Sequence, residues 1–169
     1  MNIIINIIDT ANEKIGRAVS WLSFTLVLVV CYDVFTRYFL KVSSVAVQEL
    51  EWHLFSVLFL LSAAYTLKHD DHVRVDIFYS KLNERNKAIV NIIGSLLLLI
   101  PFCLMVIFTS KNFVYSSFQI SEISPDPGGL PARFVLKSFV PVSFIFLFLQ
   151  GIGLFLKSFV TLKKKTKPD

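Results

Sequence analysis

Charged residues are scarce in this sequence. Of its 169 residues, 17% are Asp, Glu, Lys or Arg and 54% are hydrophobic, and the mean hydropathy is +0.65. A soluble globular domain carries about 25% charged residues, so this composition argues against a soluble chain. The net charge is +5, and the positive charge lies in two short places, residues 68–87 and 163–167, which membrane topology explains better than nucleic-acid binding does. We therefore expect an integral membrane protein with no nucleic-acid partner.

Cysteine is also scarce. The two cysteines, Cys31 and Cys103, lie inside apolar runs, where a thiol packs as a small hydrophobic group. Neither a disulfide nor a cysteine-ligated metal framework is expected. The sequence also shows no nucleophile-and-base set and no phosphate-binding loop, so we do not expect an enzyme.

One stretch does look like a metal site, because LKHDDHVRVDIFYS (67–80) holds two histidines and three aspartates within eight positions. A metal site needs ligands that converge from a rigid frame with supporting contacts, and no further ligand group is apparent elsewhere in the chain. Lys68, Arg74 and Lys81 match the three acids in charge, as in a solvated loop. The sequence therefore predicts neither a metal nor another cofactor here.

Four apolar segments are long enough to cross about 30 Å of hydrocarbon as helices. They cover roughly residues 18–39, 47–67, 88–109 and 134–156. Since backbone polar groups must be satisfied internally in lipid, we predict an all-α protein with one membrane domain over 1–169. Among the small residues of the spans, Gly94, Gly151 and Gly153 are expected to let helices approach closely.

The N-terminal segment MNIIINIIDTANEKIGR is not expected to be a cleaved signal peptide, because Asp9 and Glu13 interrupt its apolar residues. One helical face would carry its apolar side chains, namely Ile4, Ile7, Ile8, Ala11 and Ile15. The pattern predicts an amphipathic helix that lies at the membrane interface and leads into the first span.

The distribution of Lys and Arg predicts the orientation of the chain. With the N-terminus inside, 12 of the 17 basic residues fall on the cytoplasmic side and 5 on the other. The positive-inside rule then places both termini in the cytoplasm. The stretch 67–80 becomes a cytoplasmic loop, and the loop containing SPDPGGLPARF (124–134) faces outward, where its prolines and glycines predict a compact, turn-rich element.

Several charges near the outer ends of the spans allow two interpretations. Asp33 and Arg37 lie four residues apart and could neutralise each other at the interface, or one of them could reach a partner helix. Glu49 and Glu51 open the second span, where acids favour the positive end of the helix dipole. Acids at such a boundary can equally bind a coupling ion or contact a partner.

Two further function classes fit these patterns less well. A haem-carrying membrane anchor of a redox complex would need facing pairs of imidazoles, but His53 is predicted on the opposite side of the membrane from His69 and His72. A stand-alone proton-coupled transporter would need a carboxylate deep in a span. The third and fourth spans contain no acidic residue.

Three stretches together resemble the small membrane subunit of tripartite ATP-independent periplasmic (TRAP) transporters. These are CYDVFTRYF, the run from QELEWHLF to SKLNERNK, and SPDPGGLPARFVLKSFVPVSFIFLFLQG, within residues 15–157. The resemblance implies a bacterial inner-membrane protein in a one-to-one complex with a large multi-span subunit. That subunit would carry the sodium and substrate sites, and a periplasmic substrate-binding protein would deliver an organic acid to the pair.

The resemblance also implies roles for individual residues. We expect the subunit-interface or docking contacts to be Asp33, Arg37, Glu49, Glu51, Asp126 and Arg133. In the cytoplasmic loop, His72, Arg74 and Asp76 are expected to fix the loop conformation.

Overall fold

The protein is described by a computed structural model, which covers residues 2–69, 79 and 81–164. The chain begins with α1 (Asn2–Phe35), which continues through a π-helical turn, η1 (Thr36–Leu40). α2 (Val45–His69) follows, and then α4 (Glu84–Ile93), η2 (Gly94–Leu99) and α5 (Ile100–Gln119) form one long rod. α6 (Arg133–Lys164) completes the fold. The described residues contain helices and no strand.

Local chemistry sets two of the helix ends. Lys41 takes the left-handed conformation, with φ of 57°, and its backbone N–H bonds to the carbonyl of Thr36 at the end of η1. Asn83 caps α4, because its side-chain oxygen accepts a hydrogen bond of 2.8 Å from the backbone N–H of Asn86. Such a cap satisfies a donor that would otherwise have no partner in the first turn.

The four predicted spans are confirmed as helices that are long and apolar enough to cross a membrane. Within the described residues these helices cover Ile5–Leu40, Val45–His69, Glu84–Gln119 and Arg133–Lys163. Each is longer than the apolar segment that predicted it, because the helices continue into polar residues on one or both sides. The chain is therefore all-helical in its described part, with four candidate membrane helices.

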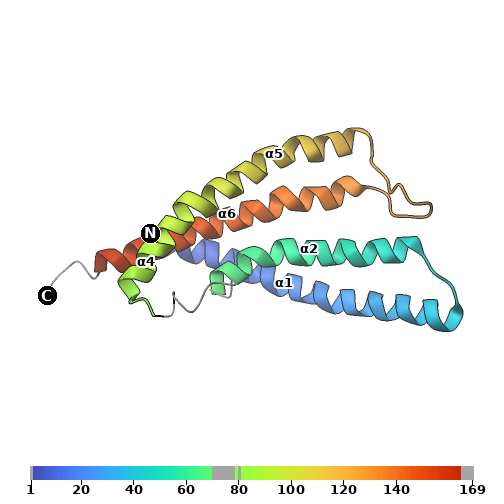
Figure 1. Cartoon of the computed structure of the whole chain (residues 1–169), viewed down its shortest axis with the longest axis horizontal. Coiled ribbons are helices and arrows are strands. Elements are labelled where there is room, and N and C mark those ends of the chain that lie inside the picture. Colours follow the sequence, from blue (N-terminus) through green and yellow to red (C-terminus); the bar gives the residue numbers. More distant parts are fainter. Residues whose placement is uncertain (1, 70–78, 80, 165–169) are drawn as a thin grey trace.

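Helix α6 lies at the centre of the bundle. It packs against α1, α2, α4 and α5, whereas α1 packs mainly on α2 and α5 mainly on α6. Figure 1 shows the start of α1 and the end of α6 at the end of the bundle where α4 lies, and the loop between α5 and α6 at the opposite end. We call these the inner end and the outer end. The first and the last described residues therefore lie at the same end of the bundle.

The small residues do not all behave as the sequence predicted. A Cβ on Gly151 would lie 2.9 Å from a methyl group of Leu99, so this glycine does allow close packing of α6. Gly94 has no neighbouring atom within 4 Å of such a Cβ, so the prediction of close approach was wrong for it within this chain. The tightest helix contact instead involves Gly16, where a Cβ would overlap the ring of Tyr65 on α2.

The predicted interfacial segment and the first span form one uninterrupted helix, α1. Its buried positions are Ile5, Ile8, Asn12, Val19 and Asp33, whereas Ile7 from the predicted apolar face is 64% exposed. The side of α1 that packs in the bundle thus includes polar residues and differs from the apolar face that was predicted to lie at the membrane interface. Whether the N-terminal half of α1 lies at a membrane interface stays a prediction.

Candidate functional site

The centre of the candidate site is Glu49, which is only 4% exposed although it is an acid. One carboxylate oxygen accepts hydrogen bonds from the Ser124 hydroxyl and, at 3.1 Å, from the Arg133 guanidinium. The other accepts a bond of 2.6 Å from the backbone N–H of Leu130. These four residues form what we call the loop cluster. It ties the second turn of α2 to the loop between α5 and α6, at the outer end of the bundle.

The loop itself, residues 120–132, is closely folded around this acid. The backbone N–H of Ser124 bonds to the carbonyl of Leu130 at 3.1 Å, and that of Gly129 bonds to the carbonyl of Asp126 at 3.0 Å. Gly128 has φ of +82°, which favours glycine. Gly129 leaves no space for a side chain, since a Cβ would lie 2.4 Å from the hydroxyl oxygen of Ser124.

A second ion pair supports the loop where α6 begins. The ammonium group of Lys137 binds the carboxylate of Glu122 and lies 4.3 Å from the centre of the Phe113 ring. The same ammonium group lowers the pKa of Glu122 below its ordinary value, and Arg133 adds to this effect. Arg133 in turn lies over the ring of Trp52, 5.7 Å from its centre. The outer end therefore combines cations, acids and aromatic rings in one packed arrangement.

The structure brings two of the predicted contact residues together, because Glu49 pairs with Arg133 across 84 positions of sequence. The first turn of α2 contains no acid, and Glu49 lies in the second turn. An interaction with the positive end of the helix dipole therefore does not explain why an acid occupies this position. Asp126 is exposed at the tip of the loop. A direct contact between any of these residues and a partner stays a prediction.

Asp33 and Arg37 form the ion pair that the sequence allowed. The Asp33 side chain is almost fully buried and the Arg37 side chain is half exposed. One carboxylate oxygen of Asp33 is buried without a hydrogen-bond partner, and the same holds for one of Glu51. The structure places neither acid in the loop cluster, and their predicted contacts with a partner are untested.

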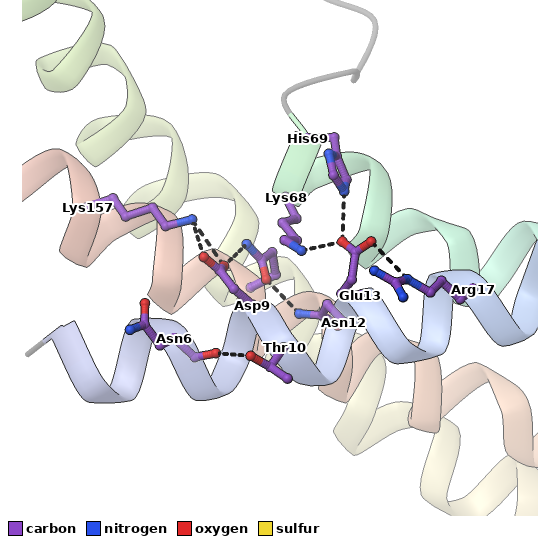
Figure 2. A network of polar contacts seen from close by, with 10 residues as sticks. Asn6, Asp9, Thr10, Asn12, Glu13, Arg17, Lys68, His69 and Lys157 are labelled. Atoms are coloured by element: carbon purple, nitrogen blue, oxygen red, sulfur yellow. Dashed lines mark hydrogen bonds and ion pairs between the residues drawn. The ribbon is translucent and has the colours of Figure 1, made fainter.

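The inner end carries a polar network that the sequence analysis missed, shown in Figure 2. In α1, Asp9 binds the ammonium group of Lys157 on α6, at 2.8 Å and 3.0 Å from its two oxygens. The side-chain N–H of Asn12 donates to the Gln150 side-chain oxygen at 2.6 Å, and both residues are 2% exposed. One turn of α1 is thus fixed to α6 by an ion pair and a buried amide pair.

Glu13 connects the same turn of α1 to the end of α2. Its carboxylate binds the ammonium group of Lys68, the ring nitrogen of His69 at 3.2 Å and the guanidinium of Arg17 at 3.4 Å (Figure 2). A signal for this network was present in the sequence. The spacing of Asp9, Asn12 and Glu13 puts three polar groups on one side of a helix.

The predicted cytoplasmic-loop residues His72, Arg74 and Asp76 lie outside the described residues. Within the described part of the chain, no group of three or more His, Cys, Asp or Glu side chains is placed to hold a metal ion. Of the five His and Asp residues in the stretch 67–80, His69 is the one within the described residues, and it contacts Glu13. The expectation that this stretch binds no metal stays a prediction.

Comparison with known families identifies the chain. A family model described as "Tripartite ATP-independent periplasmic transporters, DctQ component" matches residues 26–161, four-fifths of the sequence. The chain belongs to this family. It is thus a small component of a TRAP transporter, and the family works in a tripartite complex with a large membrane subunit and a substrate-binding protein. None of the curated proteins matches the chain.

Membership of the DctQ family confirms the resemblance that the sequence suggested. This is a family of transporter components and not of enzymes. The matched segment contains the whole loop cluster, whereas Asp9, Asn12 and Glu13 of the inner network precede it. Together with four apolar helices, the family indicates a multi-pass membrane protein.

Proposed function

We propose that this chain supports the large subunit of a sodium-coupled TRAP transporter for an organic acid and presents part of the docking face for its periplasmic substrate-binding protein. It pairs one-to-one with the large subunit in the bacterial inner membrane, with both termini in the cytoplasm. In this orientation the outer end of the bundle faces the periplasm. The sodium and substrate sites belong to the large subunit.

The loop cluster is the observation that carries the docking proposal. A buried acid that accepts bonds from a hydroxyl, a guanidinium and a backbone N–H holds a loop in one conformation. The exposed tip of that loop, from Asp126 to Gly128, then meets a partner without further ordering, which lowers the entropy cost of association. Glu49 and Arg133 act here by shaping the surface, and Asp126 acts by contact.

The absence of charged side chains from the middle of the third and fourth spans supports a role in which this subunit does not move during transport. Residues 88–110 and 138–156, within the third and fourth candidate spans, contain no charged side chain, and the ion pairs that involve α6 lie towards the two ends of the bundle. Ion-coupled transport requires polar groups near the middle of the membrane. A subunit without them suits a support for a partner that carries out transport.

The proposal is tested with the membrane pair purified from cells that express the native operon. The chain should co-purify with the large subunit, and the operon's binding protein should bind the immobilised pair. We expect both Glu49→Gln and Asp126→Arg to weaken that binding severalfold, because the first loosens the loop and the second reverses an exposed charge. Glu84→Gln, an exposed acid at the inner end, is the matched control and should have no effect.

The outcomes separate the two parts of the proposal. A pair that forms but binds its periplasmic partner equally well in both variants contradicts the docking role and leaves the support role intact. A chain that purifies without any large multi-span subunit contradicts the support role itself.

A further inference from the structure

A polar cavity of about 390 Å³ opens at the inner end, between the end of α2, the start of α4 and the end of α6. Three of the residues that line it are lysines, Lys68, Lys87 and Lys157, one from each helix. Their side chains are 17%, 29% and 40% exposed. Three partly buried ammonium groups around one cavity are suited to an anionic ligand.

The position of these lysines along the helices narrows the ligand class. The apolar segments were predicted to end at 67, begin at 88 and end at 156, so each lysine is the first residue beyond its segment. All three therefore lie where hydrocarbon gives way to lipid headgroups. At this depth the phosphate groups of the bilayer itself are the nearest anions.

The residues that line the cavity include aliphatic as well as charged side chains, as expected where lipid headgroups meet hydrocarbon. Leu67, Ala88 and Leu154 also line it, each within one turn of a lysine. The phosphate group of a phospholipid would contact the ammonium groups, and the hydrocarbon part of the same lipid would contact the aliphatic side chains. Basic pockets between membrane helices bind anionic headgroups in this way.

Carboxylates neutralise the lysines only in part. Asp9 binds Lys157 and Glu13 binds Lys68, and these two carboxylates do not line the cavity, whereas Glu84 does. Lys87 is paired at 3.4 Å with Glu84, which is 65% exposed, and an exposed pair of this kind is weak. Lys87, whose ammonium group also lies 5.8 Å from the centre of the Tyr79 ring, is thus the lysine with the weakest carboxylate pairing.

The surroundings of the cavity are basic as well. Among described residues of the inner end (2–17, 68–69, 79, 81–87 and 157–163), eight are Lys or Arg and three are Asp or Glu. The cations are Lys14, Arg17, Lys68, Lys81, Arg85, Lys87, Lys157 and Lys163, and the acids are Asp9, Glu13 and Glu84. This excess attracts anionic lipid to the end of the bundle.

We propose that this cavity is a binding site for the phosphate group of an anionic phospholipid, held by Lys68, Lys87 and Lys157. The lipid bridges α2, α4 and α6, helices that are joined at this end by few other polar contacts among the described residues. The proposal does not depend on transport or on docking at the outer end.

Native mass spectrometry of the membrane pair in detergent tests the site. Phosphatidylglycerol is titrated as the anionic probe, phosphatidylcholine as the zwitterionic one, and inorganic phosphate as the free anion. The matched variants are Lys87→Gln in the cavity and Lys14→Gln, an exposed lysine of the same end that does not line it. Lys87→Arg keeps the charge at the site.

We expect phosphatidylglycerol to bind in preference to phosphatidylcholine, and Lys87→Gln to weaken it about fivefold, with Lys14→Gln changing it by less than about twofold. Lys87→Arg should restore binding. The thermal stability of lipid-free Lys87→Gln should equal that of the unaltered chain, and its stabilisation by phosphatidylglycerol should be smaller. This second measurement separates loss of the site from loss of the fold.

Three results would overturn the proposal. Equal weakening by Lys87→Gln and Lys14→Gln would show diffuse attraction to a basic surface. Equal binding of both lipids would exclude recognition of an anionic headgroup. Binding of inorganic phosphate without phosphatidylglycerol would assign the cavity to a soluble anion.

Discussion

Replacing Gly129 by alanine tests whether close packing maintains the loop cluster. The added Cβ would lie 2.4 Å from the Ser124 hydroxyl oxygen, 2.5 Å from its Cβ and 2.8 Å from a carboxylate oxygen of Glu49. The backbone on both sides is held by hydrogen bonds, so Ser124 has to move and its bond to Glu49 is lost. Overpacking of this kind costs about 1–3 kcal/mol of the free energy of unfolding.

Gly94→Ala is the matched control, since it adds the same methyl group where no atom lies within 4 Å. Alanine in a helix is favoured over glycine by about 0.5–1 kcal/mol, so this variant should be slightly stabilised. Thermal unfolding in detergent, followed by tryptophan fluorescence, measures both. Trp52 lies beside Arg133 and reports directly on the loop cluster.

For a chain of this size, each kcal/mol shifts the unfolding midpoint by about 2–4 °C. We expect Gly129→Ala to unfold several degrees below the unaltered chain and to show an altered Trp52 emission. An unchanged midpoint and emission would refute the reasoning about packing. A destabilised variant that still binds the periplasmic protein at full affinity would instead refute the link between loop shape and docking.

Two further predictions concern the other polar contacts. Asn12→Leu removes the donor to the buried Gln150 side-chain oxygen, and Gln150→Met removes the acceptor of the buried Asn12 N–H, and each should cost about 1–2 kcal/mol. The double variant should recover most of this loss in a thermal-unfolding cycle, and strictly additive losses would contradict the pairing. The lowered pKa of Glu122 means that its pair with Lys137 stabilises the fold above pH 4.5 and that this contribution is lost as the pH falls through the lowered pKa. Glu122→Gln should therefore unfold with a weaker dependence on acid pH, and an identical dependence would exclude this role.

The spans could be predicted because their signal is local. Twenty or so consecutive apolar residues identify a membrane helix with no information about its neighbours. The turn-rich loop was also predictable, since SPDPGG is a local pattern. The ion pair of Asp33 and Arg37 follows from helical spacing alone. Each of these predictions depends on residues that are close in sequence.

The contacts between distant segments could not be predicted in this way. Glu49 and Arg133 were each singled out, but nothing in the sequence indicates that residues 84 positions apart share one hydrogen-bond network. For the inner network, Gln150 was a usable signal, because a polar residue within an apolar span usually finds a partner. The bond between Asn12 and Gln150 lies on the side of α1 that packs in the bundle, whereas the apolar periodicity predicted only the side that would face the membrane interface.

Helix α6 is fixed at both ends of the bundle. At the outer end Arg133 and Lys137 bind acids of α2 and of the loop, and at the inner end Gln150 and Lys157 bind α1. A helix held by polar contacts at both ends cannot slide or rotate without breaking several of them together. Since α6 also contacts every other long helix, its fixation stiffens the whole bundle. This rigidity suits the proposed support role, in which the small subunit stays still while the large one moves.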